Sequence, residues 1–402
     1  MTAEQRLLSG RAWDDFCDQL KLAGRAIERF GDEPDAQDRA EFYRFLTRLV
    51  RNGCERFVEN CEPNRPRLRD VPWRSTINFQ SPDQDHLLCE FDEPSEYRIT
   101  GNRGSVPYFV MAAWNAPIPR DHAARDWAGE GFAALADFDV TRLNTTGFLQ
   151  SDAIDFDAEG NFEVWVGGTE RARNWLPLTA ESCGLLIRIV HLDRANERDP
   201  VMRIERVDGV SPTPITSADV SSGLAKAGNE VLGYVELVRA WWQEQLADLP
   251  NRLRFSRNLY LSNGGVADRH HAFGTWQIAD DQALVLTFTP PETETWIFQL
   301  CSMWQENLDC YEDGRGYVNK RNAHYEPDGS VRIVVSATRP ALDGGNWVPT
   351  WGHVRGGMSL RLIKTATPPP VAVHLVQVED LAREGWSYLS SAQALMTGEV
   401  TA

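Results

Sequence analysis

The chain has 402 residues, 42% of them hydrophobic and 25% charged, which is the composition of a folded protein large enough for two cores. Its net charge at pH 7 is −17, and Lys and Arg form no dense cluster. These properties argue against nucleic acid and against anionic membranes as partners.

No apolar stretch approaches the ~18 residues of a membrane span, and no signal-peptide core follows Met1. The seven cysteines are odd in number and irregularly spaced, which is typical of reduced thiols rather than of a disulfide framework. We therefore expect a cytoplasmic protein without a membrane partner.

In chain order, the first predicted elements are helices. Apolar residues recur at helical spacing over residues 13–30 and again over residues 42–57. The same kind of pattern returns over residues 231–246. The N-terminal pair of helical stretches is followed by Pro-Asn-Arg at residues 63–65, and the stretch at 231–246 is followed by the same three residues at 250–252. This match predicts that one unit, helices followed by strands, occurs twice in the chain.

The segments that follow the helices share an ordered pattern, which is the sequence evidence for an internal repeat. An acidic turn with a glycine precedes a run that alternates at period two, at residues 156–166 and again at residues 325–335. Asn-Trp-Leu-Pro follows at residues 174–177, and Asn-Trp-Val-Pro at residues 346–349. Short half-buried strands joined by tight turns predict a β-sandwich in each unit.

Each copy then reaches a strand in which one arginine stands between apolar residues. The alternation turns Arg188 and Arg361 to the face away from the core. Either arginine could bind a carboxylate, but a structural ion pair is the simpler interpretation.

The predicted fold class is α+β, with two tandem antiparallel β-sandwich units, each preceded by a helical segment, in α-β-α-β order. The predicted segments are 1–72 (N-terminal helices), 73–194 (first β-sandwich unit), 195–254 (helical linker), 255–365 (second β-sandwich unit) and 366–402 (linker and C-terminal helix). We expect the C-terminal helix to dock on the body of the protein or on a second subunit, which would make a homo-oligomer.

The two copies differ most in two loops, which is where a site on a rigid scaffold tends to lie. Histidine and carboxyl groups can transfer protons, and aromatic rings and arginine can hold a substrate. The predicted catalytic residues are His271, His122, Asp309 and Asp313, and the predicted substrate-binding residues are Trp127, Trp304, Tyr311 and Arg315. Solvated charged loops and structural tryptophans would explain the same residues without a site.

No Gly-rich phosphate loop, nucleophile elbow or Cys-x-x-Cys pair is present, so no organic cofactor is expected. His191 and Asp193 would share one strand face, but a metal ion needs further ligands and none is evident. The adjacent His270 and His271 would point to opposite faces of a strand. We therefore expect no metal ion.

The Asp-Gly strand, the Asn-Trp-x-Pro corner and the closing strand with its arginine together resemble the domain-of-unknown-function family 1214. The resemblance covers residues 81–190 and, more weakly, residues 264–364, so the family's domain would be present as two tandem copies. It implies β-sandwiches in bacterial proteins that are usually cytosolic, often oligomeric and generally without an assigned activity. It supplies no catalytic residues.

The function stays open between different classes. The first hypothesis is a cofactor-independent enzyme, a lyase or isomerase, that acts on an apolar small molecule such as an isoprenoid, steroid or aromatic metabolite. It would use acid/base chemistry for hydration, elimination or isomerisation. The second is a non-catalytic sandwich that binds carbohydrate or lipid through exposed tryptophans. The third is a structural subunit whose tail pairs protomers.

Overall fold

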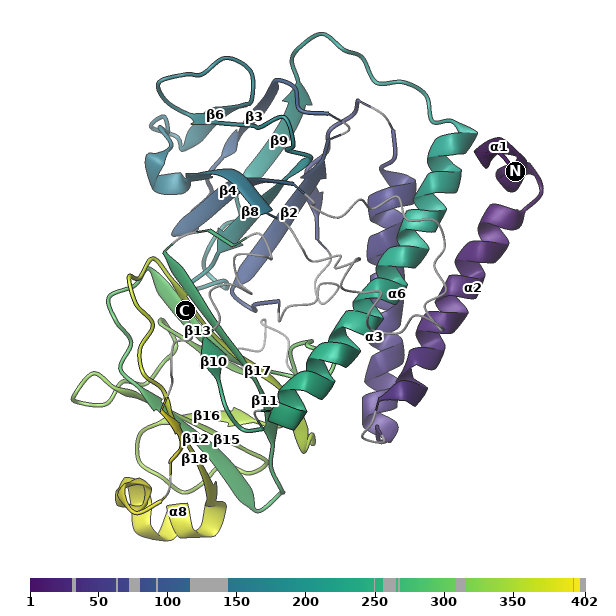
Figure 1. The fold of residues 1–402 in the computed structure, drawn as a ribbon. Helices are drawn as coiled ribbons and strands as arrows, with labels where there is room; N and C mark the ends of the chain where they lie inside the picture. The colour runs from purple at the N-terminus through teal and green to yellow at the C-terminus, as the bar shows by residue number, and fades with distance from the viewer. Residues whose placement is uncertain are drawn as a thin grey trace.

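The computed structural model describes residues 1–30, 34–62, 64–71, 80–91, 93–115, 144–248, 250–255, 265–266, 268–308, 316–392 and 394–397. A layer of long helices runs beside two β-sandwiches (Figure 1). The predicted α+β class is therefore confirmed. The helical elements are α1 (Ala3–Leu8), α2 (Arg11–Arg25), η1 (Ala26–Arg29), α3 (Ala36–Cys54), the π-helical turn η2 (Glu55–Glu59), η3 (Ser151–Ala153), α6 (Ser217–Asp248), α8 (Val378–Glu384) and η5 (Gly385–Ser390).

The strands divide between the two sandwiches. The first contains β1 (Arg69–Asp70), β2 (Gln84–Glu90), β3 (Tyr97–Asn102), β4 (Tyr108–Asn115), β5 (Asn144–Gln150), β6 (Asn161–Val166), β7 (Trp175–Leu176), β8 (Gly184–Val190) and β9 (Val201–Arg206). The second contains β10 (Arg254–Phe255), β11 (Arg269–Gln277), β12 (Gln282–Phe288), β13 (Thr295–Cys301), β14 (Tyr317–Asn319), β15 (Val331–Ser336), β16 (Asn346–Pro349), β17 (Arg355–Ile363), β18 (Ala372–Gln377) and β19 (Ala394–Thr397).

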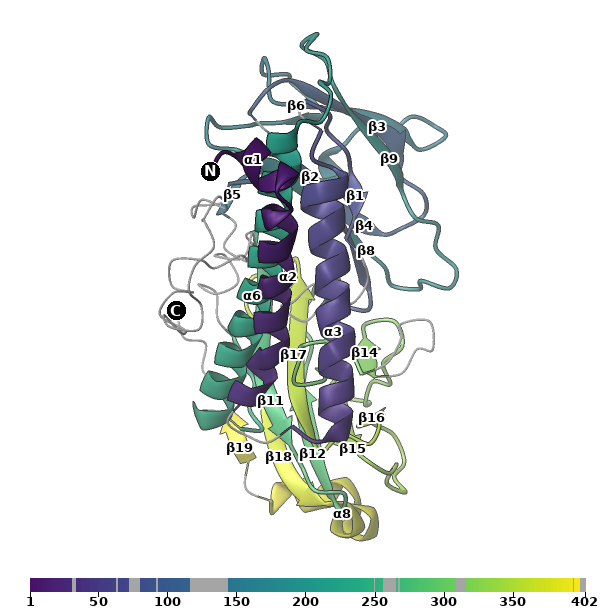
Figure 2. The same cartoon turned by 90° about the vertical axis from the view of Figure 1, so that its right-hand side faces the viewer.

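The helical layer consists mainly of α2, α3 and α6, which lie side by side (Figure 2). Helix α3 begins where the Asp35 carboxylate accepts the backbone N–H of Asp38 at 2.8 Å, which is an N-cap. The apolar faces of the three helices bury one cluster that includes Phe42 and Phe45. Trp304, from the loop after β13, enters this cluster and donates its indole N–H to the Asp38 carbonyl at 2.9 Å. The tryptophan thereby fastens the helices to the second sandwich.

The two sandwiches have the same strand order. The sheets of the first are β1-β2-β8-β4-β5 and β7-β6-β3-β9, and those of the second are β10-β11-β17-β13-β14 and β16-β15-β12-β18-β19. Each pair of sheets encloses one apolar core, with Val164 of β6 in the first core and Ile333 of β15 in the second. Strands β6 and β15 occupy corresponding places, as the repeated sequence pattern predicts.

Trp114 and Trp304 follow similar runs of residues in the two copies but do not occupy corresponding places. Trp114 lies opposite Gly184, and the residue opposite the equivalent Gly357 is Cys301, so Trp114 corresponds to Cys301 rather than to Trp304. Trp304 follows Cys301 by three residues and lies in the loop after β13.

Each sandwich also has one strand beyond the predicted end of its unit. Strand β9 pairs antiparallel with β3, and β18 pairs antiparallel with β12, at equivalent places. The stretches 195–254 and 366–402, predicted as linker and helix, therefore each contribute a strand to the preceding sandwich.

The predicted Asn-Trp-x-Pro corners are held by their asparagines. Asn174 has a φ of 49°, and its side-chain amide donates to the carbonyls of Asp155 and Glu163 at 3.2 and 2.9 Å. Asn346 makes the two equivalent bonds in the second sandwich, at 3.0 Å each. An amide side chain that satisfies two carbonyls stabilises a tight corner, which explains why the residue recurs.

The C-terminal segment, made of α8, η5 and β19, packs on the chain's own second sandwich. Leu381 is fully buried against the outer face of the sheet, where it meets Val285 and Val334. Strand β19 pairs with β18. Of the two docking modes predicted for the tail, the structure has the one on the protein's own body.

None of the described helices combines the length and the apolar character that a bilayer crossing requires. The six cysteines among the described residues are free thiols.

Candidate functional site

The outer faces of two sheets, one from each sandwich, meet near the centre of the molecule. Tyr108, Val110 and Val190 of the first sandwich pack with Ile363 of the second. The Arg269 guanidinium donates to the Tyr108 hydroxyl across this contact. We call these two facing surfaces, built on β2, β8 and β4 and on β11, β17 and β13, the inter-sandwich face.

A histidine and an arginine lie side by side on each half of the inter-sandwich face. His86 on β2 is the cross-strand neighbour of Arg188 on β8, and His271 on β11 is the cross-strand neighbour of Arg361 on β17. The residues on either side of each arginine point into the apolar cores, so both arginines leave the far face as predicted. The repeat therefore preserves a titratable group and a cation at the same place in both copies.

Asp83, at the start of β2, brings a carboxyl group to the inter-sandwich face. It is 3% exposed, and the Ser81 hydroxyl donates to its Oδ1 at 2.6 Å. Its Oδ2 is enclosed and has no hydrogen-bond partner among the described residues. Burial raises the pKa of Asp83 to about 6, although the Ser81 hydrogen bond and the Arg361 charge oppose the rise. Such a carboxyl can both hold and release a proton near neutral pH, and Oδ2 is the oxygen available for it.

The histidines of the inter-sandwich face are held neutral. Burial, together with the charges of Arg188 and Arg361, lowers the pKa of His86 to about 3. The Nδ1 atom of His86 is enclosed without a partner in the described part of the chain. Arg361 donates through Nε to Nε2 of His271 at 2.8 Å, and burial with that charge holds the pKa of His271 well below its ordinary value. Because Nε2 of His271 accepts, its Nδ1 carries the hydrogen and can donate.

The second sandwich has a counterpart of Asp83 in a different environment. Asp268 precedes His271 by the spacing that separates Asp83 from His86. Its Oδ1 is enclosed, but its side chain as a whole is 40% exposed and its φ is 64°, so its carboxyl is much less buried than that of Asp83. The Asp-x-x-His spacing is therefore common to both copies, but the buried carboxyl belongs to the first copy.

The structure describes two of the residues predicted to form the site. His271 lies on the inter-sandwich face, and Trp304 is fully buried in the helical layer with its N–H satisfied. The other six, which lie outside the described residues, are His122, Trp127, Asp309, Tyr311, Asp313 and Arg315. The site roles assigned to all eight remain predictions. The sequence feature that locates Asp83 and His86 is the Asp-x-x-His spacing shared by the two copies.

A second group of titratable side chains lies after the end of β8. Nε2 of His191 is 3.0 Å from Asp85 and 3.4 Å from Asp199, and Nδ1 is 3.1 Å from Glu197. Arg194 donates to both oxygens of Asp85, at 2.6 and 3.1 Å. Arg194 pairs with Asp85, and His191 lies within reach of three carboxylates, so we interpret this group as a polar network that ties the loop after β8 to β2.

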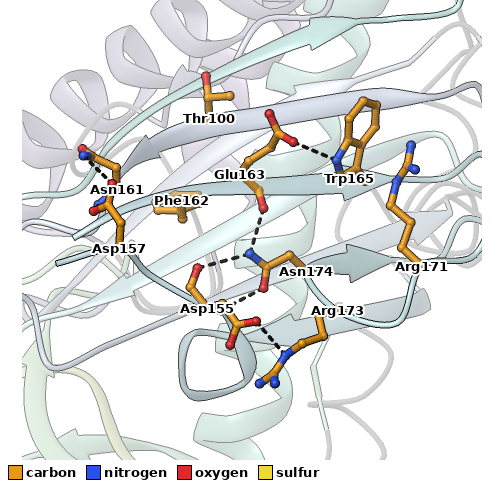
Figure 3. Close-up of a pocket in the computed structure, with 10 residues that line it drawn as sticks. All are labelled: Thr100, Asp155, Asp157, Asn161, Phe162, Glu163, Trp165, Arg171, Arg173 and Asn174. Atoms are coloured by element: carbon orange, nitrogen blue, oxygen red, sulfur yellow. Dashed lines mark hydrogen bonds and ion pairs between the residues drawn. The ribbon is translucent and has the colours of Figure 1, made fainter. Parts of the chain in front are cut away.

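An open hollow of about 590 Å³ lies on the outer face of the sheet that contains β6 (Figure 3). Its wall mixes acidic and basic side chains with Trp165. The guanidinium carbon of Arg171 lies 3.7 Å from the Trp165 ring centroid, and the indole N–H donates to Glu163 at 2.9 Å. An arginine already stacks on this ring, which makes it a poor open platform for a sugar.

Comparisons with known proteins give a family and a fold. The family described as "Protein of unknown function (DUF1214)" matches residues 277–367, within the second sandwich. The crystal structure of an uncharacterized protein from Burkholderia cenocepacia is similar over 94% of this chain and 100% of its own, with 30% identity and a TM-score of 0.83. The VPA0106 protein from Vibrio parahaemolyticus aligns over 88% of this chain and 99% of its own, but its 13% identity and TM-score of 0.45 carry no argument. No curated protein matches the sequence.

Proposed function

The chain belongs to the family of the uncharacterized Burkholderia cenocepacia protein, and from that premise we propose that it is an enzyme with an acid/base site at the inter-sandwich face. The reaction is a hydration, elimination or isomerisation of a small molecule. The observation that carries the proposal is the Asp83 carboxyl, which is buried, has a pKa of about 6 and keeps Oδ2 unpartnered among the described residues. Strongly perturbed groups of this kind gather at functional sites.

Each side chain has a separate role in the proposed reaction. Asp83 takes a proton from the substrate, or gives one, at Oδ2, while Ser81 holds Oδ1 in place. His86 and His271 act as neutral hydrogen-bonding groups that stabilise charge developing on the substrate. Arg361 fixes the tautomer of His271 and, through its charge, tunes Asp83.

The apolar substrate expected from the sequence fits the rest of the surface. Val110 and Ile297 are the cross-strand neighbours of Arg188 and Arg361, so each polar pair borders an aliphatic residue. A molecule with an apolar body and one polar reacting group suits this mixture. The alternative, a carbohydrate-binding module, would use the hollow around Trp165, where the stacked Arg171 disfavours it.

We also propose that the first sandwich is a second, diverged copy of the DUF1214 domain. The identical strand order and the equivalent His-Arg pairs support this assignment. Because Asp268 is more exposed than Asp83, the carboxyl chemistry is assigned to the first copy alone.

The proposal is tested by identifying a ligand and then changing one carboxyl at a time. Metabolites retained by the full-length protein are identified by mass spectrometry, and their conversion is followed by NMR. Asp83→Asn should lower kcat by about 10²–10⁴-fold, the usual contribution of general acid/base catalysis. The matched control, Asp268→Asn, should stay within about twofold of the parent.

The pH profile distinguishes chemistry from packing. The parent should show an ionisation near pH 6, and Ser81→Ala should move it upward because a hydrogen bond that favours the carboxylate is lost. Full activity of Asp83→Asn on a converted ligand would refute the role of Asp83.

A further inference from the structure

The two outer sheets of the sandwiches end differently at equivalent edges. In the second sandwich the far edge of β18 is paired with β19. In the first sandwich β9 is the last strand of its sheet, and no described strand pairs with its far edge. Figure 2 shows β9 at the margin of the first sandwich. An edge strand presents unpaired N–H and C=O groups that can pair with another strand.

The hydrogen-bonding register shows which backbone groups of β9 face outward. Val207 donates its N–H to the Glu96 carbonyl at 3.0 Å. In an antiparallel ladder the bonded residues alternate, so the odd-numbered residues of β9 bond to β3. Met202, Ile204 and Arg206 therefore direct their N–H and C=O groups toward the free edge.

The sequence of β9 includes the charged residues Arg203, Glu205 and Arg206, but it lacks the other features that usually protect an edge. Val201–Arg206 contains no Lys and no Pro, and it pairs with β3 without a bulge. Val201 is 72% exposed. Arg203 is exposed on the same outer face of the sheet as Val201.

We propose that β9 pairs with β9 of a second copy of this chain, antiparallel about a twofold axis through Ile204. In that register Ile204 faces its own counterpart, and Met202 faces Arg206 of the other copy, which matches the outward groups of all three residues. Arg203 then lies opposite Glu205 of the other copy in a non-hydrogen-bonded pair, where side chains are closest.

The charges favour this register over its neighbours. Arg98 already donates to Glu205 within the chain and is its cross-strand neighbour. In the twofold pairing, Arg98, Glu205 and Arg203 of the second copy form one row across the joined sheets. Positive and negative side chains alternate along this row. The axis repeats the row, which gives two such contacts per dimer.

The test is the mass of the full-length protein in solution, measured by sedimentation equilibrium over a range of concentrations. The parent should shift from the 45.3 kDa monomer to a dimer as concentration rises. Met202→Pro removes an outward N–H but no bond to β3, and it should weaken the dimer at least about tenfold. Met202→Ala, which keeps that N–H, should dimerise within about threefold of the parent.

Charge reversal tests the register. Arg203→Glu and Glu205→Arg each place like charges opposite one another and should each weaken the dimer about tenfold. The double variant restores opposite charges across the axis and should dimerise more tightly than either single variant, but below the parent, because Glu205→Arg also sets a like charge beside Arg98. Circular dichroism checks that each variant is folded.

Three results would overturn the proposal. The first is a parent that stays monomeric at all concentrations. The second is a dimer that survives Met202→Pro, which would place the interface elsewhere, for example at the C-terminal segment. The third is a double charge variant no better than the single ones.

Discussion

The two sandwiches share a strand order, but the outer face of one sheet is covered in the second sandwich and open in the first. In the second, that face is apolar, and the C-terminal segment covers it with Leu381 against Val285 and Val334. In the first, the equivalent face carries Arg98 and Glu163 and remains open as the hollow of Figure 3. A duplicated fold can therefore keep its two cores while its surfaces diverge, because the core face and the outer face of a strand vary independently.

The sandwiches also differ in how they attach to the helical layer. Arg56, from the π-helical turn after α3, pairs with Glu90 of the first sandwich and with Glu230 of α6, the latter at 2.7 Å. The second sandwich is attached by the apolar ring of Trp304 and by His353, whose Nε2 lies 3.0 Å from Glu41 of α3. Buried ion pairs also join α3 to the second sandwich, between Arg48 and Glu306 and between Arg355 and Asp38 at 3.0 Å, so what distinguishes the second attachment is the apolar ring of Trp304.

The largest expected effect tests the charged attachment. Glu230→Gln leaves the buried Arg56 without one of its two carboxylates and should lower the free energy of unfolding by about 3–5 kcal/mol, as breaking a buried ion pair does. Urea denaturation measures the change. Glu55→Gln, at a side chain that is 38% exposed, is the matched control and should change it by less than about 0.5 kcal/mol. Equal effects would show that the first sandwich does not depend on the buried pair.

Next in size is the effect of uncovering the second sandwich. Leu381→Ala removes a fully buried side chain and should cost about 2–4 kcal/mol. Hydrogen exchange should accelerate in β15 and β18 but not in β6 and β9, because only the second sandwich uses this cover. Arg383→Ala, nearby and exposed, should leave both patterns unchanged. Acceleration in all four strands would mean that the sandwiches unfold as one unit.

A smaller effect separates Asp83 from Asp268 through pH. The pKa of Asp83 is raised, so the native state binds more protons than the unfolded state between pH 4 and 6, and stability falls as pH rises through that interval. Asp83→Asn removes this loss of stability. From the rise in the pKa of Asp83 to about 6, the variant should be more stable than the parent at pH 8 by about 2–3 kcal/mol. Near pH 3.5 the two should be equally stable. If Asp268→Asn gave the same pH dependence, the proposed asymmetry would be wrong.

The smallest effect concerns His353. Burial lowers its pKa, but the Glu41 hydrogen bond and charge outweigh this and raise it. A raised histidine pKa contributes stability below the unfolded-state value near 6.5, and this contribution is lost as pH rises through the folded-state value. We therefore expect stability to fall as pH rises above about 6.5. Thermal melts of Glu41→Gln should lose this dependence, and a retained slope would assign it to another group.

Much of the local structure followed from the sequence. The period-two alternation around Val164 and Ile333 placed β6 and β15, and the two asparagine corners formed as predicted. Trp114 shows the limit of this reasoning, because Trp304 follows a similar run of residues and yet lies beyond the end of β13. Strands β9 and β18 were missed because they lie beyond the repeated motifs.

The candidate site was less accessible to sequence reasoning. His271 was chosen as a histidine near acids, and Asp83 was not chosen, because nothing local distinguishes its carboxyl from that of Asp268. The difference arises from burial between two sheets whose strands come from distant parts of the chain, and burial is what raises the pKa of Asp83.

The sequence by itself determined which side chains share a face, where the chain turns and that the unit is repeated, because these depend on neighbours a few residues away. Only the tertiary structure decided that the two His-Arg pairs face one another, that Asp83 is buried while the side chain of Asp268 is 40% exposed, and that the tail covers the second sandwich while no described strand covers the edge of β9. These features depend on contacts between segments far apart in the chain, and the free energy of such contacts is set by packing and desolvation that local patterns do not encode.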